Sequence, residues 1–180
     1  MTRAWAIRLL AVLAAIGLTA TVATADDGAT TFATSLSGFN EVPPNLTNGT
    51  GTFQITVQGN SATYTETFSN LSSPVLVSHI HFAQRGVNGG VFVFLCSNVG
   101  TPAGITVPAC PAGGGTVTGT ITAADIIAPG GDGPPANQGI TAGDFQALVR
   151  ILRSGDAYVN VHTVNFKAGE IRGQVHFGDD

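Results

Sequence analysis

Apolar and polar positions alternate in short runs along most of the chain after residue 30. In the run 52–58 the apolar positions are Phe53, Ile55 and Val57, and a second run, 62–68, follows a short Gly/Asn-containing link. A two-residue period places successive side chains on opposite faces of a strand, so these two runs predict a β-hairpin. Similar runs predict further strands at 31–37, 75–82, 91–96, 116–121, 157–163 and 170–177. Short strands separated by Gly, Pro and Asn turns indicate an all-β domain, an antiparallel β-sandwich or barrel.

Two interruptions of this pattern predict helical turns. Thr122 and Thr141 are each followed three residues later by an aspartate, the spacing of a helix N-cap with an acidic residue in the first turn. After Thr141, apolar residues recur from Phe145 at i, i+3, i+4 and i+7 until Gly155, which predicts one amphipathic helix packed on the sheet. The intervening 129–135 segment is rich in Gly and Pro and predicts an exposed loop.

The first residues predict export. Residues 1–25 combine basic Arg3 and Arg8, an apolar run at 9–18, and an Ala23-Thr24-Ala25 site, the three parts of a secretory signal peptide. The apolar run is shorter than the roughly 20 residues of a membrane span. We therefore expect cleavage after Ala25, a single domain at 26–180 without a membrane span, and location in the periplasm, on the cell surface or in the medium.

The excess of acidic over basic residues argues against anionic binding partners. The segment 26–180 holds 5 Lys and Arg residues against 11 Asp and Glu residues, a formal charge of −6. Such a chain repels nucleic acid and anionic lipid. Only 10% of the whole chain is charged whereas 43% is hydrophobic, which is typical of a folded domain rather than a disordered tail. The expected partners are an extracellular protein, a polymer or a metal ion.

Two cysteines, Cys96 and Cys110, are expected to form a disulfide in an oxidising compartment. The bond would close a loop of about 15 residues, worth roughly 3 kcal/mol in the chain-entropy model. The alternative is a pair of metal-binding thiolates, but the two residues lack the paired spacing of zinc sites.

Three of the predicted strands combine an apolar face with a second face rich in polar side chains. In the strand 75–82, His79 and His81 are two residues apart and therefore project from the same face, away from Ile80. The strands 157–163 and 170–177 repeat this arrangement. The polar positions of the three strands are His79, His81, Tyr158, Asn160, His162, Glu170, Arg172, Gln174 and His176.

Four motifs in order resemble those of the CHRD (chordin-type) domain family. They are Asn40-Glu41-Val42-Pro43-Pro44, His79-Ile80-His81 with the glycines that follow, Tyr158-Val159-Asn160-Val161-His162-Thr163, and Gly169-Glu170-Ile171-Arg172-Gly173-Gln174. Together they span residues 36–175. The resemblance implies an extracellular β-barrel or a sandwich of immunoglobulin-like or Greek-key type. The growth-factor role of chordin does not transfer, because the chain lacks chordin's cysteine-rich repeats. The segment between Cys96 and Cys110 is an addition to the family pattern.

The sharper hypothesis for the polar face is a metal site. Neutral imidazoles at i, i+2 on one strand suit copper or zinc, and a facing third histidine completes three nitrogen ligands. The ligands would be His79, His81 and His162, whereas His176 is expected to be exposed and not to bind. The His-x-His pair before a Gly/Asn-rich loop is also similar to copper–zinc superoxide dismutases. That family needs further ligands, and 84–140 contains no histidine.

The alternative is a polar network without a ligand, in which the histidines, Asn160, Glu170 and Arg172 satisfy one another and set the register of the strands. Glu41 is an extra carboxylate that could join either arrangement. The sequence favours a secreted, non-enzymatic binding module with a binding face that includes Glu41, Asn160, Glu170 and Arg172. A copper- or zinc-dependent redox enzyme and a purely structural surface protein remain the alternatives.

Overall fold

The structure is a computed structural model that describes residue 1 and residues 28–129 and 138–178. The predicted signal peptide at 1–25 lies outside this described part, apart from Met1. Most of the predicted loop at 129–135 also lies outside it.

Nine strands are the main secondary structure of the described chain. Their bounds are β1 (Thr30–Ser37), β2 (Thr50–Gln58), β3 (Ser61–Ser69), β4 (Val75–Phe82), β5 (Gly90–Ser97), β6 (Gly115–Ile121), β7 (Ala157–Thr163), β8 (Ile171–Gln174) and β9 (His176–Phe177). Each predicted strand is present. The run predicted at 170–177 is divided in two, because the N–H of Val175 donates to the carbonyl of Ala157 while β9 pairs with β1.

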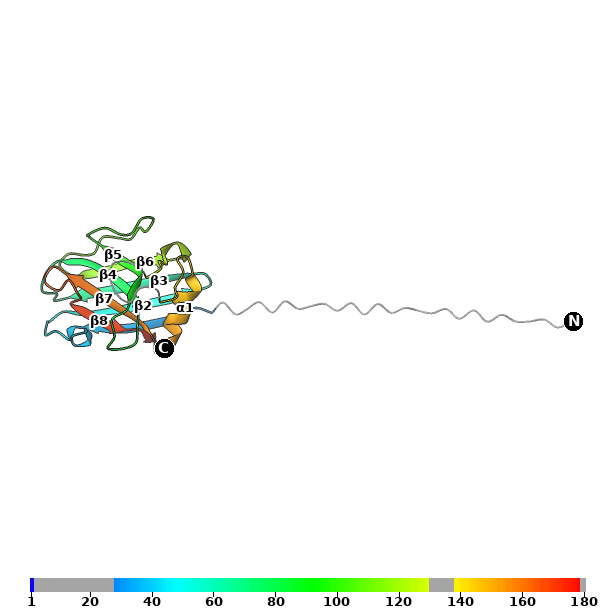
Figure 1. The fold of residues 1–180 in the computed structure, drawn as a ribbon, viewed down its shortest axis with the longest axis horizontal. Coiled ribbons are helices and arrows are strands. Elements are labelled where there is room, and N and C mark those ends of the chain that lie inside the picture. Colours follow the sequence, from blue (N-terminus) through cyan, green and yellow to red (C-terminus); the bar gives the residue numbers. More distant parts are fainter. Residues whose placement is uncertain (2–27, 130–137, 179–180) are drawn as a thin grey trace.

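The strands form one antiparallel sheet that curls almost into a barrel. Its order is β5-β4-β7-β8-β1-β2-β3-β6, with β9 beside β1. The two edge strands, β5 and β6, approach one another without a hydrogen-bonded ladder, and Figure 1 shows them side by side. The predicted all-β architecture is confirmed as a nearly closed barrel.

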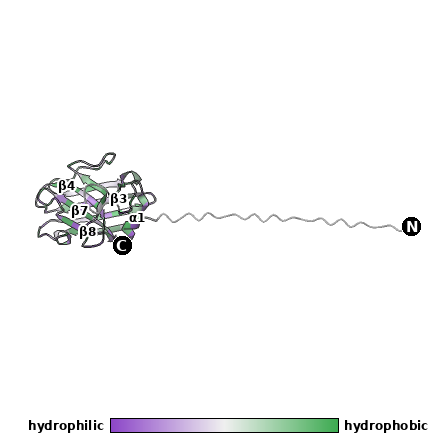
Figure 2. Cartoon of the chain, viewed as in Figure 1, coloured by the Kyte–Doolittle hydropathy of each residue, from purple (hydrophilic) through white to green (hydrophobic). Residues whose placement is uncertain are grey.

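Inward-facing side chains fill the barrel. Phe32, Ile55, Ile80 and Val159 are completely buried, and they come from four different strands. Hydrophobic and hydrophilic positions occur together along the strands (Figure 2), as the two-residue period requires. One inward position is acidic: Glu66 on β3 is also completely buried.

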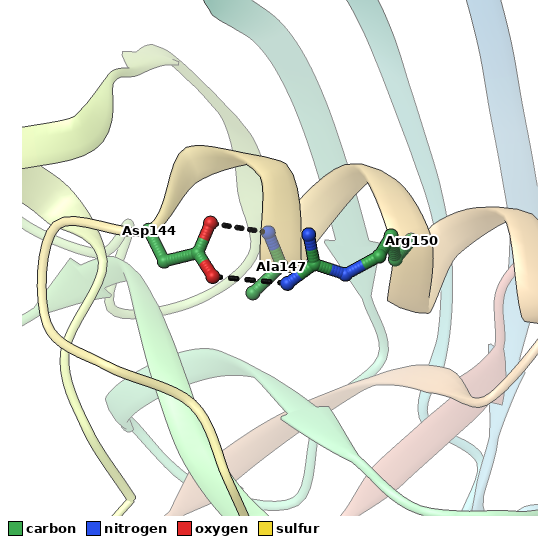
Figure 3. A network of polar contacts seen from close by, with 3 residues as sticks. All are labelled: Asp144, Ala147 and Arg150. Carbon is green, nitrogen blue, oxygen red and sulfur yellow. Dashed lines mark hydrogen bonds and ion pairs between the residues drawn. The ribbon is translucent and has the colours of Figure 1, made fainter.

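The predicted amphipathic helix is present as α1 (Phe145–Ser154), which lies at one end of the barrel (Figure 1). Its N-cap is Asp144 and not the predicted Thr141. Gly143 adopts a left-handed conformation with φ of 84°, so the helix begins only after it. Asp144 Oδ1 accepts from the N–H of Ala147 at 3.0 Å, and Oδ2 accepts from Arg150 at 2.9 Å (Figure 3).

Two single turns of 3₁₀ helix complete the described secondary structure, at Gly38–Asn40 (η1) and Ala123–Asp125 (η2). The second confirms the N-cap predicted at Thr122, whose N–H and hydroxyl both donate to the Asp125 carboxylate at 2.8 and 2.9 Å. No helix in the described segments is long and apolar enough to cross a membrane.

The predicted disulfide is present between Cys96 at the end of β5 and Cys110 in the loop before β6, with the two Cα atoms 5.0 Å apart. Asn98 supports the same loop. Its Nδ2 donates to the carbonyls of Val75 and Cys110, and its Oδ1 accepts from the N–H of Cys110 at 3.1 Å. The covalent bond therefore ties the edge strand β5 to the loop that leads into the other edge strand, β6.

Candidate metal centre

Three histidines meet on the outer face of two paired strands. His79 and His81 are on β4, and His162 is on the neighbouring antiparallel strand β7, where it lies opposite Val77. The ring centroids are 5.5 Å apart for His79 and His81, 5.1 Å for His79 and His162, and 6.1 Å for His81 and His162. One nitrogen from each ring lies within 4.8 Å of the other two. The structure thus brings together the three residues that the sequence put forward as metal ligands.

This outer face is buried rather than exposed to solvent. His79 is 8% exposed and His81 is 7% exposed. The Nε2 atoms of all three histidines are buried and have no hydrogen-bond partner among the described residues, and the same holds for Nδ1 of His79. Buried polar atoms without partners are rare in folded proteins and call for an explanation.

Backbone carbonyls fix the orientation of two of the rings. His81 Nδ1 lies 3.0 Å from the carbonyl oxygen of Gly89, and His162 Nδ1 lies 2.9 Å from that of Lys167. Because a carbonyl only accepts, each of these Nδ1 atoms carries the proton. The Nε2 atoms of His81 and His162 therefore carry lone pairs that no described group uses. A hydrogen bond of this kind on the non-ligating nitrogen is the usual support of a metal-binding histidine.

Aromatic rings flank the cluster on two sides. The Phe94 ring on β5 meets His79 edge to face, with centroids 4.4 Å apart. The Tyr158 ring stacks almost parallel to His81, with centroids 4.6 Å apart. The guanidinium of Arg172 lies 3.4 Å from the centroid of the Tyr158 ring. These contacts hold the imidazoles of His79 and His81 in place.

The electrostatic environment keeps all three imidazoles neutral. Burial lowers the pKa of His79 well below its usual value, and the neighbouring His162 and His81 lower it further. Burial also lowers the pKa of His81, to about 3, and that of His162. A neutral imidazole is the form that binds a metal ion, so these side chains need not lose a proton to do so near neutral pH.

Glu41 and Asn160 form a separate pair beside the histidines. Asn160 Nδ2 donates to Glu41 Oε1 at 2.7 Å. Burial raises the pKa of Glu41 to about 7, against the opposing effects of Arg172 and of the Asn160 hydrogen bond. A Cβ atom at Gly169 would lie 2.5 Å from Asn160 Nδ2 and 2.6 Å from Glu41 Oε1, so this pair requires glycine there. Glu41 is thus hydrogen-bonded to an amide and is not one of the three grouped ligands.

Arg172 is 2% exposed and bonds to the loop that follows β4. Its guanidinium donates to Asn88 Oδ1 at 3.0 Å and to the carbonyl of Val87 at 2.7 Å. The same loop supplies the Gly89 carbonyl that orients His81. Arg172 therefore holds in place the segment that fixes a histidine tautomer.

Glu170 lies in another polar group and is completely buried. Its carboxylate accepts from the Thr47 hydroxyl at 3.0 Å, from the N–H and hydroxyl of Ser72 at 2.7 and 2.9 Å, and from the Thr163 hydroxyl at 2.6 Å. The structure thus does not place Glu170 with the histidines. His176, on β9, is exposed, and its Nδ1 lies 3.1 Å from the carbonyl of Gln174.

Sequence reasoning did not identify three contributors to this site: Phe94 and the carbonyls of Gly89 and Lys167. A backbone carbonyl carries no signal of residue type, so its role becomes visible only from the folded chain. Phe94 could have been found from the pairing of β4 with β5, which places it directly opposite His79.

Comparison with protein families identifies the chain. The CHRD domain matches residues 32–175, so the chain belongs to the CHRD domain family. Comparison with curated proteins and with solved structures finds no significant match.

Proposed function

We propose that this CHRD domain is a non-enzymatic, extracytoplasmic binding module that takes one ion of copper or zinc through His79, His81 and His162. Two observations carry the proposal: one ring nitrogen from each histidine lies within 4.8 Å of the other two, and each ring has a buried nitrogen without a partner in the described chain. Imidazole suits both metals. Metal–nitrogen distances of about 2.0 Å bring three ligating nitrogens to about 3.5 Å from each other, so a small inward movement of the rings suffices.

Burying these nitrogens without partners costs the metal-free protein stability, which favours a bound ligand over a purely structural network. A network stabilises a fold when its members satisfy one another, and each buried polar atom left unsatisfied costs about 1–3 kcal/mol. The His79 ring has no hydrogen-bond partner at either nitrogen in the described chain, so it contributes nothing to such a network. A bound metal ion would satisfy the three Nε2 atoms, or Nδ1 of His79 in place of its Nε2.

An oxidising compartment is consistent with the site and with the disulfide. A disulfide between Cys96 and Cys110 persists outside the cytoplasm, where the predicted signal peptide would direct the chain. With both cysteines in this bond, the described residues offer no thiolate to compete for copper or zinc. The histidine nitrogens are therefore the ligands that we propose for copper or zinc.

The test is metal stoichiometry of the exported protein, purified without a histidine tag, dialysed against Cu or Zn and measured by elemental analysis. We expect one equivalent in the unmodified protein and in His176→Ala, whose histidine is exposed. We expect less than a tenth of an equivalent in His162→Ala. Equal metal content in the two variants would reject the site, and the absence of metal from the unmodified protein would reject the proposed function.

A second prediction concerns the metal-free protein. His79→Leu should raise its free energy of unfolding by about 1–2 kcal/mol, because two buried nitrogens without partners are replaced by apolar atoms of similar bulk. Chemical denaturation with a chelator present measures this difference. Destabilisation instead of stabilisation would favour a structural role for the histidine.

A further inference from the structure

The ligand set contains three donors. Among the described residues, no fourth histidine, cysteine or carboxylate joins the group of His79, His81 and His162. Glu41, the carboxylate considered for this role, instead accepts from Asn160. Protein zinc sites are almost always four-coordinate, so zinc here would need a water molecule as its fourth ligand.

Water has little access to the cluster. The Nε2 atoms of the three rings are all buried from solvent. Phe94 lies against His79 on the β5 side, and Tyr158 lies against His81. These rings cover the cluster on two sides and limit the room for a fourth, solvent-derived ligand.

The charge of the site opposes a divalent ion. The three ligands are neutral imidazoles, so they compensate none of the charge of a bound metal. Arg172 adds positive charge nearby, because its guanidinium lies 3.4 Å from the centroid of the Tyr158 ring, which in turn stacks on His81. The cost of placing an ion in a medium of low dielectric constant grows with the square of its charge. A monovalent ion therefore faces about a quarter of the desolvation cost of a divalent one.

Building on the proposed metal-binding function, we propose that the ion is cuprous copper, Cu(I), held by three histidine nitrogens without a water ligand. Cu(I), like Zn(II), has a filled d shell, but its lower charge makes it stable with three ligands in a plane, whereas Zn(II) and Cu(II) usually take four or more. Its single charge suits a neutral, water-poor ligand set. The three features (three donors, buried nitrogens, uncompensated charge) all select the same ion.

The experiment compares the affinities of the exported, tag-free protein for Cu(I) and Zn(II). Anaerobic competition with a chromophoric Cu(I) chelator gives the first, and competition with a zinc chelator gives the second. Ascorbate serves as the reductant, because a thiol reductant would attack the Cys96–Cys110 bond. X-ray absorption of the copper-loaded protein counts the ligands.

We expect Cu(I) to bind more tightly than Zn(II), by on the order of a hundredfold or more, with three nitrogen ligands. Zinc binding of equal or greater affinity, or a fourth oxygen ligand on Cu(I), would overturn the cuprous assignment and leave the proposed metal-binding function standing. Failure of both ions to bind at one equivalent would overturn both.

Phe94 provides a matched pair of variants. Phe94→Ala removes the ring beside His79 and admits water, so the preference for Cu(I) over Zn(II) should fall by at least tenfold. Phe94→Leu keeps an apolar group at this position and should retain most of the preference. An unchanged preference in Phe94→Ala would show that exclusion of water does not select the ion.

Discussion

Glu66→Gln is expected to raise the free energy of unfolding at pH 8.5 by on the order of 4 kcal/mol, and to change it little at pH 4. Glu66 is completely buried inside the barrel, where burial raises its pKa from 4.5 to about 8. Its Oε1 accepts from the Ser78 hydroxyl at 2.7 Å, and its Oε2 has no partner among the described residues. The folded protein therefore retains a proton that the unfolded chain releases.

The sign of the pH dependence follows from this difference in protons. Between pH 4.5 and about 8 the folded state binds more protons at Glu66 than the unfolded state, so this residue makes stability fall as pH rises through that window. Below pH 4.5 both states are protonated and the effect vanishes. Glutamine keeps the shape and the acceptor for Ser78 but carries no charge at any pH.

Urea denaturation of the unmodified protein and of Glu66→Gln at several pH values measures the effect. Other buried titratable groups, including Glu41 and the histidines, are common to both proteins and cancel in the difference. A difference in stability that stays constant from pH 4 to pH 8.5 would contradict the account of Glu66.

Glu170→Ala is expected to destabilise the fold by about 3–5 kcal/mol. The buried carboxylate accepts four hydrogen bonds from residues 47, 72 and 163, and so joins the segments around β2 and β3 to β7. Hydrogen bonds contribute about 0.5–1.5 kcal/mol each, and more where one partner is charged, and their loss leaves the N–H of Ser72 without its acceptor.

Two milder variants distinguish the contribution of the Glu170 carboxylate to stability from the contributions of its hydrogen-bond donors. Thr163→Val removes one hydroxyl and leaves three hydrogen bonds, so a loss of about 1–2 kcal/mol is expected. The loss of stability in Glu170→Gln should lie between those of Thr163→Val and Glu170→Ala. The hydroxyl donors can rotate to accept from the new amide, but the N–H of Ser72 cannot. Thermal and urea denaturation give the order, and a Glu170→Ala protein as stable as Thr163→Val would refute the role of the carboxylate.

The strands could be predicted well from the sequence, for a physical reason. Each strand of a barrel has one face in the core, so residues such as Phe53, Ile55 and Val57 must alternate with polar ones. The predicted start of α1 was wrong. Thr141 has the sequence pattern of an N-cap, but the left-handed conformation of Gly143 prevents the helix from including the residues before it. A local pattern does not reveal that conformation.

The candidate site was only partly predictable. The i, i+2 spacing of His79 and His81 places them on one face, and the pairing of β4 with β7 brings His162 to them. Sequence reasoning placed Glu170 and Arg172 in one network with the histidines. The structure gives Glu170 a separate set of partners, whereas Arg172 contacts the histidine site through Tyr158 and the loop after β4. Glu66 did carry a signal, since it shares the inward phase of Tyr64 and Phe68.

The most direct test of the three-histidine site is a long-range ¹H–¹⁵N NMR spectrum of the imidazole nitrogens, recorded before and after one equivalent of Cu(I) or Zn(II), both of which are diamagnetic. The account predicts that His81 and His162 begin as neutral rings protonated at Nδ1. On metal addition, Nε2 of both rings and one nitrogen of His79 should shift together, while His176 stays unchanged. Shifts confined to His176, or unchanged nitrogens in the three buried rings, would contradict it.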